Sequence, residues 1–100
     1  MLELSYKNGT VTALLSGEID HHLAPDMRAK IDSRCESCRP ARLVLDFSGV
    51  SFMDSSGIGL VMGRYRMISL LGGRLEVKNV PDELKKIFVL SGLEGLGVMK

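Results

Sequence analysis

A strand, a polar turn and a helix follow one another directly in the middle of this chain, and this order limits the possible folds more than any other feature. The mostly apolar segment Leu43–Phe47 predicts a strand. From about Ser55 to Leu71, apolar residues recur at steps of three and four, which predicts a helix with one buried face. That face comprises Ile58, Val61, Met62, Tyr65 and Ile68. Arg64 and Arg66 are expected to point away from the core.

The flanking segments predict further strands and helices. Leu2–Tyr6 and Val11–Leu15 form an antiparallel hairpin around the turn pair Asn8 and Gly9. A helix follows from about His22 to Cys35, with Asp20 as its N-cap and an apolar face of Leu23, Met27, Ile31 and Cys35. The later segments are a strand over Arg74–Lys78, a helix over Pro81–Leu90 and a glycine-broken tail over Leu93–Met99 that is either irregular or a last short edge strand.

This order of elements predicts an α/β fold. We expect a mixed sheet of four or five strands in sequential order, with strand 1 antiparallel to strand 2 and the rest parallel. Strands joined through helices pair in parallel with right-handed crossovers, which puts the helices mainly on one face. A length of 100 residues predicts one domain over residues 1–100.

Composition excludes several classes of function. The chain has 13 Lys and Arg against 12 Asp and Glu, whereas a nucleic-acid-binding domain normally carries a clustered basic surplus. No apolar run approaches the ~20 residues of a membrane-spanning helix. The first residues lack the basic-then-apolar order of a secretory signal. We therefore expect a cytoplasmic protein that binds neither nucleic acid nor membrane.

The cysteines and histidines predict no metal site and no cofactor. Cys35 and Cys38 form one pair, whereas structural zinc normally takes four ligands. His21 and His22 are neighbours on a turn, where we expect their side chains to diverge. The cysteines are interpreted as ordinary reduced thiols.

Two serines begin the central helix, with Asp54 before them and Gly57 after them. A helix start has unpaired N–H groups and a partial positive charge, so a phosphate on Ser55 or Ser56 would be stabilised there. Asp54 or Ser55 would equally serve as a simple helix cap. Gly57 and Gly59 are poor helix formers, and we interpret them as positions where another backbone or surface comes close. That interpretation favours an exposed contact site.

The same residues argue against an enzyme. A nucleophilic serine needs a positioned base, and the Gly-x-Ser-x-Gly pattern is absent around Ser55. Gly57 and Gly59 belong to no phosphate-binding loop pattern, since position 62 is Met. A nucleotide-binding regulatory domain remains an alternative hypothesis.

Several motifs resemble one family along nearly the whole chain. They lie in Gly17–His22, Ser51–Gly59, Gly63–Tyr65, Leu71–Gly73 and Leu90–Leu93. These residues resemble the STAS-domain anti-sigma factor antagonists of Gram-positive bacteria, and the Asp-Ser-Ser-Gly turn is highly specific to that family. The resemblance implies the STAS fold.

The resemblance also implies a partner-switching function, as in sporulation. The unphosphorylated antagonist, expected to be a monomer, binds an anti-sigma factor that is also a serine kinase, and the sigma factor is released. The kinase, which carries the ATP or ADP, phosphorylates the first serine after the aspartate, here Ser55, and a serine phosphatase restores it. An alternative is a STAS interaction module of a stress-response or other signalling complex with a different kinase.

The expected partner surface combines the loop after the second strand with the serine turn. Asp20 is expected to make an ionic contact with a basic residue of the kinase, which the resemblance supports and spacing alone does not. Ile58 is a core residue by periodicity and a contact residue by position. The full predicted set is Asp20, His21, His22, Asp54, Ser55, Ser56, Gly57 and Ile58.

Overall fold

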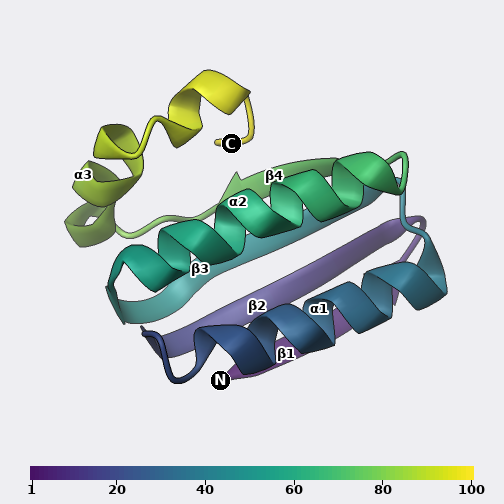
Figure 1. Ribbon diagram of the computed structural model, residues 1–100, viewed down its shortest axis with the longest axis horizontal. Helices are drawn as coiled ribbons and strands as arrows, with labels where there is room; N and C mark the ends of the chain where they lie inside the picture. Colours follow the sequence, from purple (N-terminus) through teal and green to yellow (C-terminus); the bar gives the residue numbers. More distant parts are fainter.

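The computed structural model describes residues 1–100 as a sheet with helices (Figure 1). The strands are β1 (Leu2–Lys7), β2 (Thr10–Ile19), β3 (Arg42–Met53) and β4 (Arg74–Lys78). The helices are α1 (Ala24–Cys38), α2 (Ser55–Leu70) and α3 (Asp82–Leu90), followed by the short 3-10 helix η1 (Leu93–Leu96).

The sheet has the predicted topology. Its order is β1-β2-β3-β4, with β1 antiparallel to β2 and the other neighbours parallel. Asn8 and Gly9 adopt positive φ angles of 50° and 77°, as a tight hairpin between twisted strands requires. The tail adds no full fifth strand, because η1 occupies most of it and only Met99 bridges to Val77 of β4.

The helices pack on one face of the sheet. Figure 1 shows α1 and α2 side by side, each running along the direction of the strands. Leu43, Leu45 and Phe47 alternate along β3 and are fully buried beneath the helices. Phe47 also meets Phe88 of α3 edge to face, with ring centroids 5.2 Å apart, so α3 belongs to the same layer.

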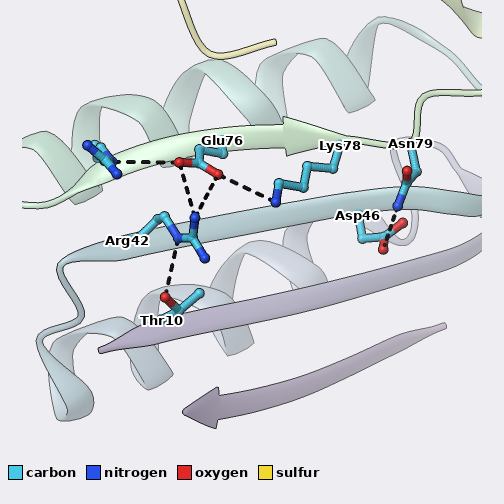
Figure 2. A network of polar contacts seen from close by, with 7 residues as sticks. Thr10, Arg42, Asp46, Glu76, Lys78 and Asn79 are labelled. Carbon is cyan, nitrogen blue, oxygen red and sulfur yellow. Dashed lines mark hydrogen bonds and ion pairs between the residues drawn. The ribbon is translucent and has the colours of Figure 1, made fainter. Parts of the chain in front are cut away.

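The opposite face of the sheet is polar and is held by ionic contacts (Figure 2). The Glu76 side chain is only 8% exposed, so its charge needs partners. Its carboxylate lies 3.2 Å from Arg42, 3.6 Å from Arg74 and 3.8 Å from Lys78. These three cations compensate the buried charge, and the face needs no helix to cover it.

The first helix differs from its prediction. It begins at Ala24 instead of His22 and continues to Cys38. Leu23 is exposed, and Ala24 takes its place on the buried face beside Met27, Ile31 and Cys35. The expected N-cap at Asp20 is also wrong, because the Asp20 carboxylate closes a separate turn before the helix.

The predicted orientation of Arg64 in α2 is wrong as well. Its side chain points inward and the residue is 5% exposed. Its Nε lies 2.7 Å from Oδ1 of Asp32 on α1, and this ion pair compensates the buried charge. Val61 and Ile68 are buried as predicted, whereas Ile58, Met62 and Tyr65 are only partly buried.

Candidate functional site

Two turns meet at one edge of the sheet, where the parallel strands β2 and β3 both end. Ile19 pairs with Met53 in the last position of this ladder. The Asp54 N–H donates to the Ile19 carbonyl at 3.2 Å. The turn that starts at Asp20 and the turn that starts at Asp54 therefore lie side by side, and α1 and α2 begin at this edge (Figure 1).

The first turn is closed by Asp20. Its Oδ1 accepts the N–H groups of His22 at 2.9 Å and Leu23 at 3.1 Å. The Leu23 N–H, with a smaller contribution from His22, lowers the pKa of the Asp20 carboxyl from 3.8. The Asp20 carboxylate is therefore ionised at neutral pH, and no hydrogen bond within the chain uses its second oxygen.

The first turn also holds two exposed histidines. The rings of His21 and His22 lie 4.1 Å apart at a tilt of 39°. The expectation that they diverge is wrong, because the two rings lie against each other. No group of three or more His, Cys, Asp and Glu in the structure could hold a metal ion.

The second turn is the N-cap of α2. Asp54 has extended backbone angles, and its Oδ1 accepts the Ser56 N–H at 2.8 Å. The Asp54 carbonyl also accepts the Gly57 N–H at 3.0 Å. Asp54 therefore performs the capping role that sequence alone left open between Asp54 and Ser55.

Ser55 is left free by this arrangement. It is the first residue of the 16-residue helix α2 and is exposed. No hydrogen bond within the chain involves its hydroxyl, whereas Ser56 is half-buried and donates its N–H to Asp54. A phosphate on Ser55 would sit at the positive end of α2, where an anion is stabilised.

The close packing of α2 on the end of β3 requires a glycine at position 57. Gly57 is buried, and a Cβ at this position would collide with the Cγ and Sδ atoms of Met53. The close approach expected at Gly57 is therefore present, but the approaching group belongs to the same chain and not to an outside surface. Gly59 is exposed, with nothing within 4 Å of an added Cβ. Ile58 is half-buried against the core.

Sequence reasoning missed a groove beside these turns. It lies between α1 and α2 and is lined by cationic side chains that include Arg28, Arg64 and Arg66. Burial raises the pKa of the Asp32 carboxyl and lowers that of the Arg64 guanidinium, so each group depends on the other. The glycine spacing from Gly59 to Gly63 was the one available signal of an open helix face.

The cysteines lie outside this site, in the last two turns of α1. Cys35 is buried and Cys38 is partly buried, and both are free. Burial, followed by the nearby Asp32 charge, raises the pKa of the Cys35 thiol to about 11. The helices are also too short or too polar for any of them to traverse a bilayer.

Comparison with known proteins gives concordant matches. The family model described as STAS domain matches residues 2–97. The anti-sigma F factor antagonist of Lysinibacillus sphaericus is 40% identical over 84 residues, which is 84% of this chain and 72% of that protein. The structure of the anti-sigma factor antagonist SpoIIAA in its unphosphorylated form matches with a TM-score of 0.87 and 36% identity, covering 100% of this chain and 86% of the other. The structure of the Bacillus cell fate determinant SpoIIAA in the phosphorylated form matches with a TM-score of 0.79 and 36% identity, covering 100% and 89%.

These matches agree with the fold. The sheet order, with only β1 antiparallel, and the helices on one face are the STAS arrangement. The relatives are matched over more than two thirds of their own length, so the likeness extends well beyond a short motif. This chain belongs to the STAS domain family, among its anti-sigma factor antagonists.

Proposed function

We propose that the unphosphorylated chain binds an anti-sigma factor that is also a serine kinase, and that this binding releases the sigma factor. Phosphorylation of Ser55 by the same kinase then switches the chain off, and a serine phosphatase restores it. The observation that carries this proposal is the free hydroxyl of Ser55 at the first position of α2. The kinase supplies the ATP, the metal ion and the catalytic base.

The proposed partner surface comprises the two adjacent turns. Asp20 offers an ionised carboxylate to a basic side chain of the kinase. Ser55 enters the kinase site, and Asp54 holds the start of α2 so that the hydroxyl keeps one position. The contact is completed by His21, His22, Ser56 and the half-buried Ile58. The buried Gly57 lies under this surface and lets the first turn of α2 pack closely.

The proposed switch is local. A phosphoserine carries about 1.5 to 2 negative charges at neutral pH. The N-terminus of α2 stabilises that charge, so the fold is preserved. At the partner surface the same charge joins the carboxylates of Asp20 and Asp54, and the contact loses its complementarity. The likeness of the whole chain to SpoIIAA in both forms supports a switch without refolding.

A displacement assay tests the function. The chain is added to a preformed complex of the anti-sigma factor and its sigma factor, with ADP present, and the free sigma factor is measured. We expect release by the unaltered chain and by Ser55→Ala, and weak release by Ser55→Asp. Equal release by Ser55→Asp and the unaltered chain would refute the switch, and no release by the unaltered chain would refute the function itself.

We also propose that the chain works as a cytoplasmic monomer and that residues 1–100 form one STAS domain. A single core cluster that runs from Val11 in β2 to Val98 after η1 supports the second point. Sedimentation equilibrium would test the monomeric state, since a dimer would double the measured mass.

A further inference from the structure

The groove between α1 and α2 begins at the edge that carries Ser55. Its volume is about 650 Å³, and its lining includes His21 and Ser56, which belong to the two turns. The wall from α2 is bare, because nothing lies within 4 Å of an added Cβ at Gly59 or Gly63. The groove is thus a continuation of the proposed partner surface.

The groove has more positive than negative charge. Arg28 from α1 and Arg64 and Arg66 from α2 line it. Arg64 pairs with Asp32. Arg28 and Arg66 are exposed and make no direct ion pair, although the Arg28 charge lies near Asp32. Three arginines thus line the groove, no carboxylate lines it, and two of the arginines have no direct ion pair.

Arg64 is also short of hydrogen-bond acceptors. Its side chain is 6% exposed, and its Nη1 is buried without a hydrogen-bond partner. A buried guanidinium nitrogen without an acceptor is unfavourable. The groove thus combines unpaired exposed arginines with a buried arginine that lacks an acceptor, and both features call for an anionic oxygen.

We propose that this groove binds a carboxylate side chain of the anti-sigma factor kinase. This inference rests on the proposed function and adds a second contact to it: Asp20 takes a basic residue of the kinase, and the arginines take an acidic one. A protein carboxylate suits the groove because arginine pairs well with it and because the groove adjoins the partner surface. The volume is also far larger than a small inorganic anion needs.

Calorimetric titration of the full chain against the anti-sigma factor kinase of the same bacterium, loaded with ADP, tests the inference. Arg28→Glu combined with Arg66→Glu should raise the dissociation constant at least about tenfold and reduce its salt dependence. Lys86→Glu is the matched control, because Lys86 is exposed on α3 and lies outside the groove. The control should change the dissociation constant by less than about twofold.

A second variant fills the groove without changing charge. Gly63→Leu meets no atom within 4 Å at its Cβ and favours the helix, so the melting temperature should not fall. Its binding to the kinase should nevertheless weaken, because the added side chain occupies the space for the carboxylate.

The outcomes separate this inference from the function on which it rests. Failure of the unaltered chain to bind the kinase would refute both. Tight binding by the unaltered chain together with unchanged binding by the arginine and Gly63 variants would refute only the groove contact. Stabilisation by inorganic phosphate that depends on Arg28 and Arg66, without any effect of these arginines on kinase binding, would instead identify a small-anion site and overturn the proposal.

Discussion

The turns that follow β2 and β3 both start from an aspartate, Asp20 and Asp54, yet they present different groups to the surface. Asp20 and Asp54 each accept the N–H of the residue two positions ahead. After Asp20 the chain makes a separate turn of exposed residues before α1 begins at Ala24. After Asp54 the helix begins at once, with Ser55 as its first residue.

The difference arises from the residue three positions after each aspartate, which is Gly57 in one turn and Leu23 in the other. Gly57 has no side chain, so the first turn of α2 can lie directly on Met53. In the other turn Leu23 occupies the N-cap position of α1 with its side chain exposed, and it makes no cap hydrogen bond. The comparison teaches that Gly57 allows Ser55 to be exposed in a fixed position at a helix start. The turn after Asp20, in contrast, exposes its side chains on a loop.

The largest effect is expected from a substitution that disrupts the close packing of Gly57 on Met53. Gly57→Leu should lower the free energy of unfolding by about 3 kcal/mol, because its side chain overlaps Met53 in a packed core. Gly59→Ala is the matched control and should raise that free energy by up to about 1 kcal/mol, since its site is open. Urea denaturation measures both, and equal stabilities would contradict the assigned role of Gly57.

The ion pair that joins the two helices comes next. Arg64→Met should lower the free energy of unfolding by about 2 kcal/mol, because the Asp32 carboxylate loses its partner in a partly buried place. Adding Asp32→Asn should restore part of this loss, and a double-mutant cycle measures the coupling. Additive effects of the two substitutions would contradict the pairing. Arg66→Met, at an exposed position, should have little effect.

Loss of the second turn's cap should cost less. Asp54→Ala removes the acceptor of the Ser56 N–H and should lower the free energy of unfolding by about 1 kcal/mol. It should also slow phosphorylation of Ser55, because the start of α2 is held less firmly. Denaturation and a timed kinase assay check the two effects, and an unchanged stability would argue against the cap.

The smallest effect concerns the first turn and depends on pH. The pKa of Asp20 in the folded state is lowered below 3.8. Its negative charge therefore stabilises the fold at any pH above the pKa of the unfolded state. This contribution is lost as the pH falls through the pKa of the folded state. Asp20→Asn should therefore lower the melting temperature slightly at pH 5, and the difference should vanish at strongly acidic pH. A difference that grew on acidification would contradict this sign.

The sequence predicted much of the fold because local signals and topology agree. The Asn8 and Gly9 pair, the alternating strands and the polar turn before Ser55 each determine structure within a few residues. The groove could not be predicted in this way. Arg64 points inward only because Asp32, on another helix, pairs with it, and periodicity within α2 carries no information about that partner.

The local geometry of the candidate site could be predicted to a similar extent. The parallel pairing of β2 and β3 brings the turns of Asp20 and Asp54 together, as the order of elements implies. The close approach at Gly57 was expected, but sequence did not identify Met53 of the same chain as the neighbour. Packing partners depend on the three-dimensional arrangement, whereas a helix start and its cap are encoded locally.

Tandem mass spectrometry after incubation with the anti-sigma factor kinase and ATP tests the central claim most directly. Ser55 is exposed with a free hydroxyl, whereas its neighbour Ser56 is half-buried. We therefore predict one phosphate, on Ser55, which persists in Ser56→Ala and disappears in Ser55→Ala. A phosphate on Ser56 or elsewhere, or full phosphorylation of Ser55→Ala, would contradict the account.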